Sequence, residues 1–343
     1  MQALVLSKDT TPDKSERYDP LSLSSVPTPE VGSDHTLIQI HAAALNHRDV
    51  FIRQGLYPRI VYGSILGSDG SGIEVSSGQR VLINPSVNWE HDPLGPEDAA
   101  KYGMLGLLPF PGTFAEYVAV PKRLVHPIPP HLSFEEAAAL PLAGLTAWRA
   151  VMSKGGVGTG SVVLVSGIGG GVALFALQFA VAAGAKVFVT SSDPEKIRKA
   201  VTLGAAGGVN YKDDDWPKQL TSMAKQPVDV VIDGAGGDSI AAYTKLLRVG
   251  GKLVSYGATT GSIASVVLPV IFLKQLQLLG STMGNEKEFA QMVKFVEQHR
   301  IRPVVNGVWD GLGKAEDIFD KMRKGSQFGK LVLRIRSDTQ GKL

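Results

Sequence analysis

The chain has no cysteine among its 343 residues. Disulfide bonds, thiolate nucleophiles and cysteine-ligated zinc are therefore excluded, and a reducing compartment suits such a chain. The sequence also lacks a long run of basic residues, and its formal net charge is only +3. Because the basic residues are scattered rather than grouped, the composition does not indicate a nucleic-acid partner.

Two further absences concern export and membranes. Residues 1–19 lack a cationic start followed by a long apolar core, so we expect no secretory signal and a cytoplasmic protein. The segment Ser161–Ala185 carries no charge and is long enough to span a bilayer. Its three adjacent glycines, Gly169–Gly171, instead favour a tight turn between a buried strand and a buried helix. We therefore expect no membrane partner.

The length and the local patterns favour two domains. Up to about His126 the chain is β-rich, with short apolar runs separated by Gly, Pro and Ser. Ser133-Phe-Glu-Glu136 then forms a capping box, in which the serine hydroxyl and the last glutamate satisfy backbone N–H groups at a helix start. Clear strands in the first part are predicted at Thr36–Ala42, Gly72–Val75 and Arg80–Ile83.

Beyond this point strand and helix patterns alternate. Such alternation predicts a parallel sheet covered by helices on both faces, and six strands are the size of a dinucleotide-binding sheet. The segment after residue 285 is not needed for this sheet and is expected to fold back onto the N-terminal part. The six strands are predicted at Val162–Val165, Lys186–Thr190, Val209–Tyr211, Val228–Ile232, Lys252–Tyr256 and Leu276–Gly280.

The sharpest motif is VVLVSGIGGGVALFALQFA, which begins at Val162. It reads either as Gly167-x-Gly169-x-Gly171 or as Gly167-x-x-Gly170-x-x-Ala173. In both registers the glycines allow a sharp turn and a close approach of the backbone to a pyrophosphate. The free amides at the start of the next helix, around Gly171 and Val172, can then bind phosphate oxygens. The position of this cluster between an apolar strand and an apolar helix predicts a dinucleotide site.

The end of the second strand indicates which coenzyme is used. An NAD site usually carries an acidic residue here, which binds the ribose 2′-hydroxyl. In this chain the strand ends in Ser191 and Ser192, and the next carboxylate, Asp193, precedes a proline and is expected to cap a helix. Hydroxyl groups leave room for a 2′-phosphate, and Lys196 can supply a positive charge. The pattern therefore favours NADPH.

Several further segments, in order, make the chain similar to the medium-chain dehydrogenase/reductase superfamily. They most resemble its zinc-free quinone oxidoreductase branch, which includes zeta-crystallin, and the similarity covers nearly the whole chain. The segments are ALNHRDVFIRQGLYP from Ala44, GSDGSG from Gly67, GTFAEYVAVP from Gly112, EEAAALPLAGLTAW from Glu135, DGAGG from Asp233 and GKLVL from Gly329.

The resemblance implies a GroES-like, β-rich catalytic domain with a Rossmann domain inserted into it. We expect the catalytic domain to comprise residues 1–125 and 286–343, and the Rossmann domain, a doubly wound parallel six-stranded sheet, to comprise 126–285. The resemblance also implies further contacts with the coenzyme. These are Asn46 and Thr146 near the nicotinamide, Ser191, Ser192, Lys196 and Tyr211 around the 2′-phosphate, and Gly234 and Gly257 along the coenzyme trough.

The chain departs from the zinc-using branch of this superfamily at the metal ligands. Where that branch has a cysteine and a Gly-His-Glu motif, this sequence has Asn46-His47-Arg48-Asp49 and Gly67-Ser68-Asp69. Ser68 replaces the expected zinc histidine, and the cysteine-rich structural zinc loop is missing. A replacement site from His47, Asp49 and Asp69 is conceivable in ligand type. We favour a site without metal.

Without a metal, the reaction should suit an acceptor that takes hydride readily, such as a quinone or an α,β-unsaturated carbonyl compound. Oxygen charge that develops in the reaction needs hydrogen-bond donors. The candidates are Asn46 and Tyr57, with a proton from Tyr57 or solvent, whereas Asp49 is expected to orient the neighbouring backbone. Alternatives are a zinc-free alcohol dehydrogenase, a trans-acting enoyl reductase, or a non-catalytic NADPH-binding protein. A last strand at Leu276–Gly280 could pair across a homodimer, as in relatives.

Overall fold

The computed structural model of the protein describes residues 1–10, 17–259 and 265–336. It consists of two compact units, which we call the split unit (Met1–Leu142 with Asn285–Leu343) and the central unit (Ala143–Gly284). Helix α2 (Phe134–Ala139) lies in the split unit, where it packs on strands of the sheet. The domain division at residues 125/126 and 285/286, drawn from the sequence, stays a prediction.

The split unit is built around a mixed sheet that contains seven strands in the described part of the chain. Its order is β16-β17-β3-β4-β5-β9, and β8 also pairs with β3. Strands β16 and β17 run parallel, and the other pairs are antiparallel. The strands are β3 (His35–Ala44), β4 (Asp69–Glu74), β5 (Arg80–Ile83), β8 (Tyr117–Pro121), β9 (Val125–Pro127), β16 (Val305–Asp310) and β17 (Lys330–Arg334).

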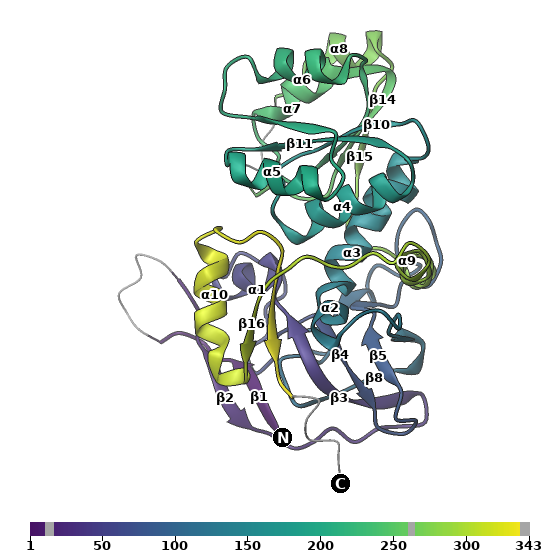
Figure 1. Cartoon of the computed structure of the whole chain (residues 1–343). Helices are drawn as coiled ribbons and strands as arrows, with labels where there is room; N and C mark the ends of the chain where they lie inside the picture. Colours follow the sequence, from purple (N-terminus) through teal and green to yellow (C-terminus); the bar gives the residue numbers. More distant parts are fainter. Residues whose placement is uncertain (11–16, 260–264, 337–343) are drawn as a thin grey trace. The chain divides into compact units, whose positions relative to one another are not determined.

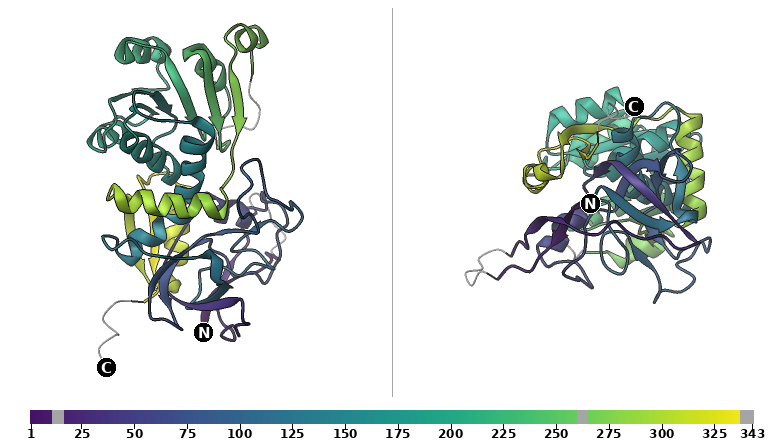
Figure 2. Two further views of the ribbon diagram at one scale, coloured as in Figure 1. Left: turned by 90° about the vertical axis from the view of Figure 1, so that its right-hand side faces the viewer. Right: turned by 90° about the horizontal axis from the view of Figure 1, so that it is seen from below.

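Strand β3 joins the two ends of the chain in this sheet. It pairs with β17, so that Val332 lies opposite Ala44, and Figures 1 and 2 show the yellow C-terminal strands against the purple N-terminal ones. Alternate residues of β3, such as Ile38 and Ile40, are completely buried, as expected for a strand with one face on the core. In the structure, strands of the last segment thus share a sheet with strands of the N-terminal part.

Two small sheets and four α-helices complete the split unit in the described residues, together with two short 3-10 helices. Strands β1 (Gln2–Leu6) and β2 (Leu21–Ser25) pair with each other, as do β6 (Ser86–Val87) and β7 (Gly103–Met104). The predicted capping box starts α2, with Ser133 and Glu136 bonded to each other's backbone N–H groups. The other helices are α1 (His47–Arg53), α9 (Glu286–Gln298) and α10 (Ala315–Arg323).

The central unit contains a parallel sheet, six-stranded in the described part of the chain, in the order β12-β11-β10-β13-β14-β15. The direction of strand order changes between β10 and β13, which is where open α/β sheets bind ligands. All six predicted strands are present to within a few residues, and the predicted α/β fold is confirmed. The strands are β10 (Val162–Val165), β11 (Lys186–Ser191), β12 (Gly207–Asn210), β13 (Val228–Asp233), β14 (Leu247–Ser255) and β15 (Gln277–Gly280).

Helices cover both faces of this sheet. In Figure 1 helices α4 and α5 lie on one side of the strands and α6 and α7 on the other. The uncharged run from residue 161 is divided into a buried strand, the glycine turn and a buried helix, and none of the described helices has the length and apolar character needed to cross a bilayer. The helices are α3 (Pro141–Trp148), a π-helix (Arg149–Gly155), α4 (Gly171–Ala182), α5 (Pro194–Thr202), α6 (Trp216–Ala224), α7 (Ser239–Leu246) and α8 (Leu268–Leu273).

Candidate active site

Helix α1 presents the first group of candidate residues. Asn46 is its N-cap, in an extended conformation, and Asp49 lies in its first turn. The Asp49 carboxylate accepts the backbone N–H of Asn46 at 2.9 Å, so it satisfies one of the donors that a helix start leaves free. This bond fixes the backbone from which the Asn46 side chain projects.

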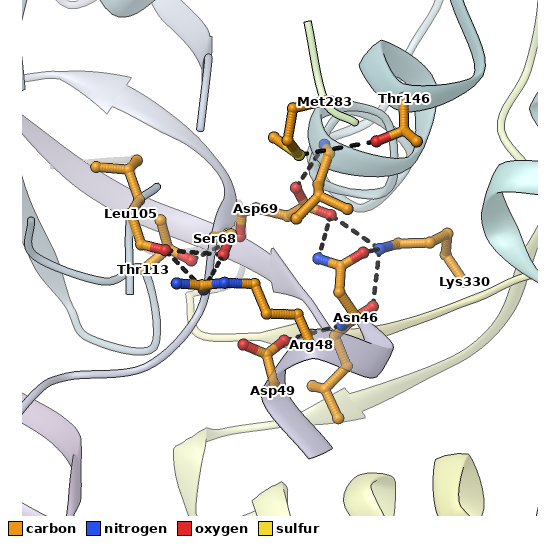
Figure 3. Close-up of polar contacts among 12 residues, drawn as sticks. Asn46, Arg48, Asp49, Ser68, Asp69, Leu105, Thr113, Thr146, Met283 and Lys330 are labelled. Carbon is orange, nitrogen blue, oxygen red and sulfur yellow. Dashed lines mark hydrogen bonds and ion pairs between the residues drawn. The ribbon is translucent and has the colours of Figure 1, made fainter. Parts of the chain in front are cut away.

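A buried polar cluster joins α1, β4 and β17 (Figure 3). The Lys330 ammonium donates to Asp69 Oδ2 at 2.8 Å, to Asn46 Oδ1 at 2.6 Å and to the Leu45 carbonyl at 2.7 Å. The Asn46 amide donates to the same Asp69 oxygen at 3.0 Å. Asp69 is fully buried, and Lys330 and Asn46 are only 4% and 6% exposed. The pair is therefore a buried ion pair whose members are also hydrogen-bonded, and it sets the orientation of the Asn46 amide.

The other Asp69 oxygen is also bound. Asp69 Oδ1 accepts the backbone N–H of Leu142 at 2.7 Å, and the Asp69 carbonyl accepts the Thr113 hydroxyl at 2.7 Å. A buried carboxylate is stable only when such bonds replace its lost hydration. Both carboxylate oxygens of Asp69 are thus engaged by donors of the split unit.

Asp49 is in a different electrostatic state. Its carboxyl is completely buried, and burial raises its pKa to about 6, although the positive charge of Arg48 and the bond from Asn46 oppose this rise. Its second oxygen, Oδ1, is enclosed without a hydrogen-bond partner in the described structure. A carboxyl in this state takes up a proton more readily than an ordinary aspartate.

Arg48 extends from α1 toward Ser68, at the start of β4 (Figure 3). Its Nη1 donates to the Ser68 hydroxyl at 2.7 Å and to the Leu105 carbonyl at 2.9 Å, and Ser68 itself donates to that carbonyl at 2.8 Å. The guanidinium lies over the ring of Tyr57, 5.0 Å from its centre. Tyr57 is partly buried against the apolar core of the split unit. Its observed partner is therefore the Arg48 cation.

The central unit places the glycine cluster at the turn between β10 and α4. Gly167 and Gly169 have φ values of +61° and +132°, which side-chain-bearing residues rarely adopt, so the turn requires glycine. Gly170 is the N-cap of α4 and has no side chain that could bond to the helix amides. A Cβ atom on Gly167 or Gly170 would meet nothing within 4 Å, so the turn faces open space. Gly171 and Val172 begin the helix and carry the first N–H groups.

The end of β11 lies beside this turn. The Thr190 hydroxyl accepts the backbone N–H of Gly167 at 3.1 Å, and Lys196 lies so close that a Cβ on Gly169 would be 3.0 Å from its Cδ and 3.4 Å from its Nζ. The structure thus brings the lysine to the glycine turn. Ser191 is buried and Ser192 is exposed.

The remaining predicted contacts lie elsewhere in the central unit. Tyr211 directly follows β12 and is 38% exposed. Gly234 and Gly257 are neighbours, since a Cβ on Gly257 would be 3.1 Å from the Gly234 carbonyl oxygen. Thr146 is buried in α3, and its hydroxyl lies 3.7 Å from the Met283 sulfur.

The structure adds functional groups that the sequence analysis did not single out. Asp233, fully buried at the end of β13, accepts the Ser166 hydroxyl and the backbone N–H groups of Ala235 and Gly236, and so shapes the loop that carries Gly234. Arg48 and Lys330 were also missed. The local sequence marks Lys330 only as a lysine that begins an apolar strand, and nothing in the local sequence marks Arg48 as a functional residue.

Comparison with known proteins assigns the chain to a family. Residues 32–130 match the alcohol dehydrogenase GroES-like domain, and residues 171–298 match a family described as zinc-binding dehydrogenase. A zinc-type alcohol dehydrogenase-like protein, YogA, from Leptosphaeria maculans is 42% identical over 93% of this chain and 95% of the relative. The chain belongs to the medium-chain dehydrogenase/reductase superfamily.

Other members of this superfamily are similar over the same length. The acryloyl-coenzyme A reductase of Sulfurisphaera tokodaii is 29% identical over 91% of this chain and 96% of its own. The crystal structure of an NAD-dependent alcohol dehydrogenase superposes with a TM-score of 0.88, at 35% identity, and covers 98% of this chain and all of that one. As a member of the superfamily, the chain is an oxidoreductase of small molecules, for which a nicotinamide coenzyme is expected.

The zinc that the matched description implies does not fit this chain. In the described residues no three His, Cys, Asp or Glu side chains are grouped as metal ligands. Ser68, at the place of the zinc histidine, is bonded to the Arg48 cation, and Asp69 and Asn46 are bonded to the Lys330 cation. The cations Arg48 and Lys330 are thus bonded to the residues that would have to serve as metal ligands, whereas a metal needs negative or neutral ligands around it.

Proposed function

We propose that the protein is an NADPH-dependent reductase that transfers hydride to a quinone or an α,β-unsaturated carbonyl compound without a metal, as in the zinc-free quinone oxidoreductase branch. The observation that carries this proposal is the cation-filled cluster of Arg48, Ser68, Asp69 and Lys330, where zinc-using members hold their metal. When bound, a reduced nicotinamide supplies the hydride, and the chain's own residues must bind and orient the coenzyme and the acceptor.

The choice of NADPH rests on the end of β11. Ser191 and Ser192 replace the acidic residue of an NAD site, and Lys196 lies against the glycine turn. Asp193, the nearest carboxylate, is used as the N-cap of α5, where it accepts the backbone N–H of Glu195 at 2.8 Å. The Asp193 carboxylate is therefore used to cap α5 rather than to bind a ribose hydroxyl. This supports the proposal that the segment binds the 2′-phosphate of NADPH. Tyr211 is proposed as a further contact.

In the catalytic part we propose that Asn46 contacts the nicotinamide or the substrate and that Asp49 orients the backbone of Asn46. Tyr57 is proposed to line the acceptor site. Thr146 is proposed as a second contact for the nicotinamide, and Gly234 and Gly257 as the lining of the coenzyme trough.

The alternative activities are a zinc-free alcohol dehydrogenase or an enoyl reductase acting on a substrate bound to another protein. Both activities stay open because the relatives include alcohol dehydrogenases and an acryloyl-coenzyme A reductase. A non-catalytic NADPH-binding protein is the third alternative.

Coenzyme oxidation separates these functions. Purified protein would be mixed with NADPH or NADH and a panel of quinones, enones and aldehydes, and with alcohols in the reverse direction, while zinc is measured in the same sample. We expect NADPH oxidation with quinones or enones at substoichiometric zinc. Tight NADPH binding without turnover would favour the binding protein, and one zinc per chain with alcohol oxidation would refute the proposal.

We also propose a homodimer formed at the outer strand β15. Leu268, Phe272 and Leu273 of α8 are 65–71% exposed, and Leu278 of β15 is 44% exposed. Such a group of apolar side chains beside an unpaired strand edge is typical of an association surface. Light scattering should give a dimer for the natural chain and a monomer for Phe272→Glu, and a natural monomer would exclude this assembly.

A further inference from the structure

The split unit buries two cations near each other in the fold, and their hydrogen bonding differs. Lys330 has three N–H groups, and all three have acceptors: Leu45 O, Asn46 Oδ1 and Asp69 Oδ2. Its charge is balanced by the Asp69 carboxylate, which is completely buried. Lys330 is therefore saturated, and it has nothing left to offer a ligand.

Arg48 is not saturated. A guanidinium carries five N–H groups, and only the two on Nη1 are used, by Ser68 and by Leu105. Its Nε is enclosed without an acceptor, whereas Nη2 is not among the enclosed atoms. The residue as a whole is only 8% exposed. Within the part of the chain that the structure describes, no carboxylate forms an ion pair with it.

This state of Arg48 is energetically unfavourable for a purely structural residue. A buried charge without a bonded counter-charge destabilises the folded state, and each enclosed polar group without a partner adds to that cost. The neighbouring Asp49 does not fully balance the charge of Arg48, because the Asp49 carboxylate accepts the backbone N–H of Asn46 instead of bonding to the guanidinium. The Tyr57 ring and Ser68 hold the guanidinium in place. The group is thus fixed in position, with donors left over for a ligand.

We propose that Arg48 is a catalytic residue that donates the N–H groups of its Nη2 to the carbonyl oxygen of the substrate and stabilises the negative charge which develops there. This inference deepens the proposed function and rests on it. In this proposal Arg48 supplies the positive charge that a metal supplies in zinc-using members. Arg48 is bonded to Ser68, which replaces the zinc histidine of those members.

The step balances with the reduced nicotinamide dinucleotide as the reductant. The acceptor carbon forms a C–H bond with the transferred hydride, and the electron pair of the C=C or C=O bond moves toward the carbonyl oxygen. The coenzyme is oxidised by two electrons and the acceptor is reduced. Arg48 stays protonated and only donates hydrogen bonds, because a guanidinium does not lose its proton in proteins, and the proton that completes the product comes from solvent.

The inference also narrows the substrate class. A fixed guanidinium favours acceptors whose oxygen gains much negative charge in the transition state, as in a simple enone. A quinone is a stronger electrophile and should depend on this charge less. The site should also bind a small carboxylate, because an anion matches the unpaired cation.

The test compares two acceptors in Arg48→Met and in the natural protein. With 2-cyclohexenone we expect kcat/KM to fall about 100-fold, the usual effect of removing an oxyanion donor, and with 1,4-benzoquinone no more than about 10-fold. The Kd for NADPH should stay within about threefold. Equal losses with both acceptors would mean that Arg48 is structural, and no loss would refute its role.

Arg53→Met is the matched control, because Arg53 lies in the same helix and is also buried, but its donors are used by Glu316 and the Asp19 carbonyl. It should lower the thermal midpoint without changing the ratio between the two acceptors. If Arg48→Met does not fold, Arg48→Lys keeps the charge without the planar fork, and it should show the same ordering of losses.

Calorimetric titration with benzoate is a second readout that needs no turnover. The NADPH-loaded natural protein should bind benzoate, and the Arg48 variants should bind it at least tenfold more weakly. If the natural protein shows no turnover with any acceptor, the proposed function fails. Benzoate binding that still depends on Arg48 would in that case keep the anion site, whereas binding that is absent or indifferent to Arg48 overturns it.

Discussion

In the central unit the polar groups of the candidate site are chiefly backbone amides at a glycine turn, whereas in the split unit they are charged side chains inside a sheet core. The first kind of site needs a sharp turn and a helix start, both of which are local in the chain. The second needs Asn46, Asp69 and Lys330, and the last two are 261 positions apart in the chain. A local site thus depends on backbone conformation, and an assembled site depends on charge balance, so the two should respond differently to substitution.

Lys330→Met should have the largest effect, because it leaves the Asp69 carboxylate buried without its cation. We expect the free energy of unfolding to fall by about 3–5 kcal/mol, measured by urea titration. The double variant Asp69→Asn/Lys330→Met removes both charges and should cost less than the single variant. If the single and the double variant had the same free energy of unfolding, the balance between the Asp69 and Lys330 charges would not be what stabilises this cluster.

The second effect comes from Asp49 and depends on pH. Its folded-state pKa is raised, so folding favours the protonated carboxyl; this contribution is fully present below about pH 4 and is lost as pH rises through about 6. Asp49→Asn, which is neutral throughout, should gain about 3 kcal/mol relative to the natural protein between pH 4 and 7, since one pKa unit is about 1.4 kcal/mol. Urea titrations at several pH values measure the difference, and parallel profiles would contradict it.

Gly169→Ala tests the backbone-built site of the central unit. A side chain at φ +132° is strained and would press on Lys196, so we expect a loss of about 2 kcal/mol in stability and at least a tenfold weaker Kd for NADPH. Gly160→Ala is the control, because Gly160 also has a positive φ but lies before β10, with open space around it. It should lose stability and keep its NADPH affinity; an equal loss of affinity would show that the turn itself is unimportant.

Lys196→Ala should have the smallest effect and should act only on binding. Loss of one partly exposed ammonium should weaken NADPH about tenfold, or about 1.4 kcal/mol, and leave NADH nearly unchanged. Lys199→Ala, one turn further along α5, should change neither. Fluorescence titration with both coenzymes measures the ratio, and equal effects on NADPH and NADH would remove Lys196 from the 2′-phosphate site.

The comparison also explains what could be predicted from the sequence. The six strands of the central sheet, the turn at Gly167–Gly171 and the capping box at Ser133 follow from patterns within a few residues of each other, and the structure confirms these elements. Helix α1 was not predicted, because its seven residues are too few for a clear periodicity. The pairing of Arg48 with Ser68 and of Lys330 with Asp69 depends on which strands become neighbours, and no local pattern encodes that.

The pairing of β3 with β17 has a consequence for how the protein is made. During synthesis the central unit is contiguous, and all its residues leave the ribosome before β17 is translated. The split unit can complete its sheet only when β17 reaches β3, and contacts of such sequence separation form slowly. A nascent chain that ends before residue 330 would therefore carry a folded central unit beside an open sheet edge along β3. At that stage the Asp69 carboxylate still lacks its cation, because Lys330 is the first residue of β17.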